Sequence, residues 1–309
     1  MLKEFNSLLD LLKVFADEQS CIDHFTAIRW SEKPYCPHCG GEKVYHFADK
    51  KTHKCGDCRK KFSIRVGTIF EDSKIPLQKW FMAIYLATSH KKGISSIQLS
   101  KDIDVTQKTA WFMLHRLRHA SQTKSFNTPS LGGIGKVVEI DETYLGGKEK
   151  NKHANKRTKG TQGRSTKTKS AVLGMLERGG ELRTIKVQNG ASYSIMPAIV
   201  TNIDAGTSVM TDEAHAYNYL PATYTHQTVN HSHRVYACGD IHTNSIEGVW
   251  SLFKRGILGI QHHISPKHLD RYLTDFNFRY NTRKQGEGER VNNLLSRTSG
   301  RLTYKELIA

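Results

Sequence analysis

The sequence predicts a mixed α/β protein in which two small N-terminal modules precede a larger domain. Two closely spaced cysteine pairs stand near the N-terminus, and helical periodicity covers residues 75–120. After residue 135 the apolar pattern changes to one of strands alternating with helices. We place the domain boundaries at 1–65, 66–125 and 126–309. A chain of 309 residues is long enough for these parts and for at least one substantial core.

Composition points to a polyanionic partner. The formal net charge is +17, and such an excess favours nucleic acid through counterion release. A membrane fits less well, because no apolar run approaches the ~20 residues needed to span a bilayer. The N-terminal residues have interleaved acids and no small-residue cleavage site, so we expect no signal peptide and a cytoplasmic protein.

Residues 1–30 have apolar positions at helical spacing, and the cysteine pairs follow them. Cys36 and Cys39 form one C-x-x-C turn, and after fifteen residues Cys55 and Cys58 form another. Two such turns joined by short β-like arms can present four thiolates to one tetrahedral Zn²⁺ ion. An iron–sulfur or redox site is the alternative. Four sulfurs close the site, so we expect the neighbouring histidines on the surface: His38, His46 and His53.

Three helices are expected next, over residues 75–90, 93–105 and 106–120. The last two are joined by a tight turn and form a helix-turn-helix pattern, although any small helical bundle shows similar periodicity. If the pattern binds DNA, its second helix presents four side chains to a groove: Gln107, Lys108, Trp111 and His115. Trp111 could equally be a core residue.

A polar linker over residues 121–135 leads into the larger domain. The expected elements are a strand ending at a carboxylate, a hairpin turning at Arg178–Gly179–Gly180, a short helix containing Pro197, two further strands and two closing helices. Their ranges are 136–145, 170–188, 192–203, 207–220, 225–232, 244–255 and 266–282. This order is that of a ribonuclease H-like fold.

In that fold, acidic residues meet at the ends of the first and fourth strands and on a late helix. Asp141, Asp212 and Glu247 stand at these places. Two Mg²⁺ ions held by such carboxylates can stabilise both the attacking and the leaving oxygen of a displacement at phosphorus.

Each acid also has a purely structural interpretation. Asp141 could be a turn former and Asp212 a cap, while Asn244 and Glu247 fit the spacing of a capping box. Three nearby acids could serve as ligands instead: Glu139, Glu142 and Glu213.

Basic residues near the acids are expected to contact DNA. The segment 146–169 holds nine Lys or Arg and one Glu, which suits phosphates, although it could be only a solvated loop. The candidate contacts of the larger domain are Lys156, Arg157, Lys159, Arg164, Lys167, Lys254 and Arg255.

Several blocks of the chain resemble the zinc-ribbon DDE transposases of bacterial insertion sequences, the ISXO2-like transposase family. They include "AIRW" before "CPHCG", "CGDCRKKFS", "VGTIFEDSKIPLQKWFMAIYL", "EIDETYLGG", "TDEAHAY" and "HTNSIEGVWSLFKRGI". The resemblance runs from about residue 15 to 285. It implies that Asp141, Asp212 and Glu247 are the catalytic triad, and the 34 residues between the last two fit that family.

The resemblance further implies a structural Zn²⁺ ion, two catalytic Mg²⁺ ions with Mn²⁺ as a substitute, and a nucleoid-associated bacterial protein. Such a transposase would bind the terminal inverted repeats of its element, cleave at the element ends and join the 3′-hydroxyls to target DNA, as a homodimer or larger assembly on double-stranded DNA. The alternatives are a transposase-derived DNA-binding regulator without catalysis, and a metal-dependent nuclease or resolvase that cleaves without joining.

Overall fold

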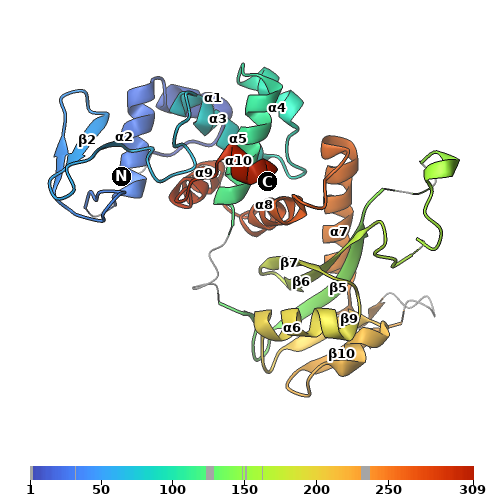
Figure 1. Cartoon of the computed structure of the whole chain (residues 1–309). Coiled ribbons are helices and arrows are strands. Elements are labelled where there is room, and N and C mark those ends of the chain that lie inside the picture. The colour runs from blue at the N-terminus through green and yellow to red at the C-terminus, as the bar shows by residue number, and fades with distance from the viewer. Residues whose placement is uncertain are drawn as a thin grey trace. The chain divides into compact units, whose positions relative to one another are not determined.

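The chain is described by a computed structural model that divides it into two compact units (Figure 1). One unit combines Met1–Gln122 with Thr282–Ala309, and the other is Thr123–Asn281. The structure describes residues 3–31, 33–122, 129–147, 149, 152–161, 163–230 and 237–309. Part of the expected linker and part of the lysine-rich segment therefore lie outside the described residues.

The first unit is helical, with a small β-sheet near its beginning. Its elements are α1 (Leu8–Val14), α2 (Glu18–Arg29), β1 (Val44–His46), β2 (Thr52–Cys55), β3 (Lys61–Ser63), α3 (Leu77–Ser89), α4 (Ser96–Asp102), α5 (Gln107–Ala120), α9 (Glu287–Ser296) and α10 (Tyr304–Ile308). The helical segment expected over 1–30 is two helices, because Asp17 caps the second one. Its carboxylate accepts the Ser20 N–H at 2.7 Å.

The last residues of the chain pack in the first unit, although the sequence placed them in the domain 126–309. Helix α9 packs against α3 and buries Val291, Leu294 and Leu295. The guanidinium of Arg290 is also buried and donates to the Thr88 carbonyl at the end of α3. Apolar burial and this hydrogen bond together attach the segment to the helical unit.

Helices α4 and α5 begin where the sequence predicts, which is after a cap at Ser95 or Ser96 for the first and at Thr106 for the second. The hydroxyl of Ser95 accepts the Gln98 N–H at 3.0 Å, and the hydroxyl of Thr106 accepts the Thr109 N–H at 3.2 Å. The two helices are in contact with each other.

The second unit is built on a five-stranded sheet with helices on both faces. Its elements are β4 (Leu131–Gly132), β5 (Val137–Leu145), η3 (Ala154–Lys156), β6 (Ser170–Glu177), β7 (Leu182–Val187), α6 (Ser192–Asn202), β8 (Ile203–Asp204), β9 (Ser208–Asp212), η4 (His215–Tyr219), β10 (Thr225–Val229), β11 (Ala237–Cys238), β12 (Ile241–His242), α7 (Asn244–Gly256), η6 (Ile257–Gln261) and α8 (Leu269–Asn281). The strand order is β10-β9-β5-β6-β7. Strands β5, β6 and β7 are antiparallel neighbours, and β9 and β10 add to the other edge of β5 in parallel.

Each face of this sheet has its own core. On one face α6 packs Ile195 and Ile199 against Val138 and Ile140 of β5, and on the other face α7 and α8 cover β6 and β7 (Figure 1). Gly174 of β6 allows α7 to come close, since a Cβ there would lie 2.4 Å from the ring of Trp250. None of the helices in the described parts of the chain is long and apolar enough to cross a bilayer.

Candidate functional site

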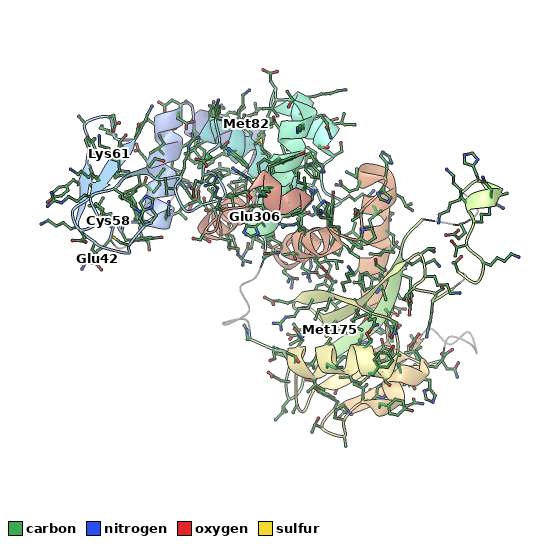
Figure 2. The ribbon with its side chains drawn as sticks, viewed as in Figure 1. Glu42, Cys58, Lys61, Met82, Met175 and Glu306 are labelled. Atoms are coloured by element: carbon green, nitrogen blue, oxygen red, sulfur yellow. The ribbon has the colours of Figure 1, made fainter. Side chains whose placement is uncertain are left out.

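The structure brings the four predicted zinc ligands together. All four sulfur atoms lie within 4.8 Å of one another, and the Cys36–Cys58 and Cys39–Cys55 sulfurs are each 3.6 Å apart. The Cys58 N–H points at the Cys55 sulfur at 3.4 Å, and that backbone donor lowers the pKa of the Cys55 thiol to about 7. Four thiolates at this spacing fit one tetrahedral zinc ion. Cys58 is labelled in Figure 2.

One histidine of the ribbon is not where the sequence placed it. His53 was expected on the surface, but it is buried, with its ring 5.0 Å from that of Trp30. Its Nδ1 lies 3.0 Å from Nδ1 of His46, which faces it from β1. The His53 ring is therefore part of a small core beneath the three-stranded sheet of β1, β2 and β3, which we call the ribbon sheet. His38 and His46 are exposed as expected.

Two of the three predicted catalytic acids stand side by side on neighbouring strands. The parallel pairing of β5 with β9 matches Val137 with Ser208 and Glu139 with Met210. Two residues further along each strand are Asp141 and Asp212. Because side chains alternate along a strand, both acids lie on the face of the sheet that Glu139 shares.

The position of Asp141 in its strand differs from the prediction. The sequence placed Asp141 at the strand end, but β5 continues to Leu145 because its last residues pair with β6. Only the parallel pairing with β9 stops before Asp141. Asp141 therefore lies within β5, at the point where β5 is no longer paired with β9 but is still paired with β6.

The acids are close enough to affect one another's protonation. Burial raises the pKa of Asp141 to about 7, and the neighbouring charges of Asp212, Glu142 and Glu247 add to this rise. Burial and the charge of Asp212 also raise the pKa of Glu142. A cation bound among these carboxylates would offset both burial and repulsion, and oxygen ligands of this kind suit Mg²⁺.

Asp212 is engaged by a residue of the lysine-rich segment. Its Oδ2 lies 3.0 Å from a guanidinium nitrogen of Arg164, and its Oδ1 accepts the Ala214 N–H at 3.0 Å. Among the described residues, the four cysteines are the one group of three or more side chains close enough, as they stand, to hold a metal ion. The three acids are thus more widely spread than the cysteines.

Glu247 lies in the first turn of α7, but not in the capping box that the sequence allows. Asn244 is the first residue of the helix, and the cap position belongs to Thr243. The carboxylate of Glu247 accepts a hydrogen bond from the Thr243 hydroxyl at 3.0 Å. The N-x-x-E spacing therefore does not form its motif here, because the helix begins one residue too early.

The side chain of Thr243 does not cap α7, and Glu139 of β5 takes this role instead. Its side chain is fully buried, and its Oε2 accepts the Ile246 N–H of α7 at 2.9 Å. Its Oε1 lies 2.7 Å from Nε of Arg178 and 3.2 Å from Nδ1 of His242. Glu139, a possible metal ligand in the sequence, is here committed to holding the helix that carries Glu247.

Arg178, which is half-buried beside Glu139, completes this group, and the sequence alone indicated no role for it in the site. The sequence marks it only as part of the hairpin turn. In the structure it also donates to the carbonyls of Asp240 and His242, at 2.7 and 2.9 Å. The guanidinium thereby joins the hairpin to the segment just before α7, and we call Glu139, Arg178 and His242 the α7 clamp.

Of the four side chains predicted to face a DNA groove, two are exposed, one is half-buried and one is buried. Gln107 and Lys108 lie exposed in the first turn of α5, where Gln107 donates to the Ser96 hydroxyl at 2.8 Å. His115 is wholly buried, with its ring 4.4 Å from that of the half-buried Trp111. Its assignment to a DNA groove is corrected, because the helix turns that position toward the interior.

The basic residues predicted to contact phosphates are on the surface of the second unit. All of them are exposed: Lys156, Arg157, Lys159, Arg164, Lys167, Lys254 and Arg255. The last two lie in the final turn of α7, the helix that carries Glu247.

Comparison with known families and proteins places the chain among transposases. Residues 130–281 match the ISXO2-like transposase domain, and residues 16–61 match the transposase zinc-ribbon domain. A protein described as an uncharacterized protein in transposable element ISH50, from Halobacterium salinarum, is 31% identical over 280 residues. That match covers 87% of this chain and 92% of the relative.

A solved structure gives only a faint likeness. It is a chain from the structure of the simian T-cell lymphotropic virus intasome in complex with PP2A regulatory subunit B56 gamma. The sequence identity is 13% and the TM-score is 0.27, with 58% of this chain and 63% of that chain covered. A similarity this low does not establish a shared fold.

Proposed function

The chain belongs to the ISXO2-like transposase family, and from this we propose that it binds the terminal inverted repeats of an insertion sequence and catalyses Mg²⁺-dependent cleavage and strand transfer. The zinc-ribbon match and the four-cysteine cluster support a structural zinc ion within it. As two element ends must be joined, the active form would be at least a dimer on DNA.

One observation carries the catalytic part of this proposal. Asp141 and Asp212 each lie two residues beyond the last matched pair of the neighbouring strands β5 and β9, and the charges of Asp212 and Glu247 both help to raise the pKa of Asp141. In chain order, the acids come from the first and fourth strands of the five-stranded sheet, β5 and β9, and from the late helix α7. That order of elements supports a ribonuclease H-like fold for this unit.

The acidic residues of the site would bind the metal, and a basic residue would bind the DNA phosphate. Asp141, Asp212 and Glu247 would hold Mg²⁺, which when bound stabilises the charge on the attacking and leaving oxygens. Because burial and the neighbouring acids raise the pKa of Asp141 to about 7, a cation would compete with a proton for that carboxylate, and metal binding should weaken as the pH falls below 7. Arg164, which pairs with Asp212 here, would bind a phosphate beside that carboxylate in the metal-bound protein.

The α7 clamp would act by positioning. It fixes the first turn of α7 against β5 through the Ile246 N–H, one residue before Glu247. A shift of about 1 Å in a reacting group can cost roughly a hundredfold in rate. Glu139 and Arg178 would thus support activity without touching the substrate.

The remaining parts would recognise DNA. We propose that α4 and α5 form a helix-turn-helix, with Gln107 and Lys108 at base edges, and that the exposed basic residues of the second unit contact phosphates. The alternative is a DNA-binding regulator without catalysis, in which the ion pair of Arg164 with Asp212 would not have to open.

One experiment separates these functions. The purified protein would be incubated with Mg²⁺ and a labelled duplex that carries the inverted repeat flanking its gene. Products joined to a second DNA identify a transposase, whereas cleavage without joining identifies a nuclease or resolvase. Binding without either product identifies a regulator.

A further inference from the structure

One face of the ribbon sheet carries aromatic and basic side chains in a single row. Tyr45 of β1 pairs with Lys54 of β2, which pairs with Lys61 of β3. Directly paired residues project on the same side of a sheet, so these three side chains lie next to one another. Lys61 is labelled in Figure 2.

Phe47 extends this row. It follows Tyr45 by two residues, and its N–H donates to the Thr52 carbonyl, which continues the pairing of β1 with β2. It therefore projects on the same side as Tyr45. The ammonium of Lys61 lies 5.3 Å from the centre of the Phe47 ring. We call Tyr45, Phe47, Lys54 and Lys61 the ribbon platform.

The opposite face of the sheet already has a structural role. There His46, His53 and Phe62 form the corresponding row, and their rings lie 5.0 to 6.4 Å from that of Trp30. Within that row His53 and Phe62 are buried, whereas Tyr45 is 52% and Phe47 39% exposed. Two large aromatic rings are therefore presented to solvent on a sheet whose core lies behind it.

The charge around the platform fits a nucleic acid. Exposed lysines flank it at positions 50, 51 and 60. The carboxylate of Asp49 accepts hydrogen bonds from the Lys51 and Thr52 N–H groups and the Thr52 hydroxyl, at 2.7 to 3.0 Å, so it holds the turn between β1 and β2. The platform thus combines two π-faces with a positive rim.

This combination suits unpaired bases better than an intact duplex. Exposed aromatic rings stack on bases that are splayed out of a helix, and lysines follow the backbone that carries them. In a duplex the bases are already stacked and paired, so the rings would gain little. We propose that the ribbon platform binds single-stranded DNA, with Tyr45 and Phe47 stacking on unpaired bases. Given the proposed function, such bases would occur at a nicked or frayed element end.

The test uses the full-length, zinc-loaded protein without Mg²⁺. Its binding to a single-stranded thymidine oligonucleotide and to a blunt duplex of equal length would be compared for wild type and for the double variant Tyr45→Ala, Phe47→Ala. We expect the dissociation constant for the single strand to rise by about tenfold or more, with a change of less than about twofold for the duplex. Tyr219→Ala, which removes an exposed tyrosine of the second unit, is the matched control and should change neither.

A second measurement does not need the variant to fold. The wild-type protein would be photocrosslinked to a thymidine strand containing 5-iodouracil, and the crosslinked peptide should contain Tyr45 or Phe47. If the double variant lost affinity equally for the single strand and the duplex, the proposal would be overturned in favour of a phosphate-binding surface. Unchanged single-strand binding, or crosslinks only elsewhere, would also overturn it. Because no strand is cut or joined in this experiment, failure here is distinct from failure of the proposed transposase activity.

Discussion

Removing the guanidinium of the α7 clamp should loosen α7 and with it the first turn that carries Glu247. In Arg178→Ala, the carboxylate of Glu139 would stay fully buried without its closest cation, and the carbonyls of Asp240 and His242 would lose their donor. Removing one partner of a buried ion pair costs about 3–5 kcal/mol. Since His242 and the Ile246 N–H still face Glu139, we expect the lower end of that range.

Hydrogen exchange at the Ile246 amide measures this effect directly, because that amide donates to Glu139. A loss of about 3 kcal/mol corresponds to roughly a hundredfold faster exchange through opening of the helix start. The matched control is Lys136→Ala, which removes an exposed lysine that pairs with Glu177 of the same hairpin. That change should cost less than about 1 kcal/mol. Equal exchange in the two variants would refute the clamp as the anchor of α7.

Three further predictions concern the zinc ribbon, DNA recognition and pH. The purified protein should carry roughly one zinc ion per chain, and the variant Cys55→Ser should lose that ion. Hydrogen exchange should then speed up in residues 30–65 of the variant, while residues 130–281 stay protected. Zinc retained by the variant would contradict the four-cysteine ligand set. Lys108→Ala should lower the preference for element ends over random DNA by roughly 1–3 kcal/mol. The double variant Lys156→Gln, Lys159→Gln should instead weaken binding to both kinds of DNA equally and make binding less dependent on salt. Filter binding at several salt concentrations measures both effects. Burial lowers the pKa of His24 below its ordinary 6.5, so the unfolded chain binds the proton more readily and stability falls as pH drops below 6.5. Urea titrations at several pH values should show a smaller fall for His24→Gln, and an equal fall would exclude this cause.

Features set by local sequence could be predicted well. The two C-x-x-C turns meet as expected, and the Gly179–Gly180 turn joins β6 to β7. The helix starts at Ser95 and Thr106 also agree with the sequence, which allowed Ser95 or Ser96 as the first cap. These features depend on residues a few positions apart, whose conformational preferences survive in the folded chain.

Features that depend on distant residues could not be predicted. Glu139 and Arg178 meet only because β5 and β6 are antiparallel, and their pairing with the α7 segment spans more than 60 residues. Nothing in the spacing of Glu139 distinguished a cap from a metal ligand. The burial of His115 was missed because a polar side chain on an amphipathic helix was assigned to the solvent side. Helices α9 and α10 were not expected at all.

Replacing one carboxylate oxygen tests the central proposal most directly. Glu247→Gln keeps an acceptor for the Thr243 hydroxyl, so the helix start should stay folded and DNA binding should persist. It removes the charge that offsets the dehydration of Mg²⁺. We therefore expect Glu247→Gln to bind the labelled element ends as wild type does and to lose nearly all cleavage and joining, as Asp141→Asn and Asp212→Asn should. Near-normal joining by Glu247→Gln, measured beside an active wild-type protein, would contradict the assignment of Glu247 as a catalytic ligand.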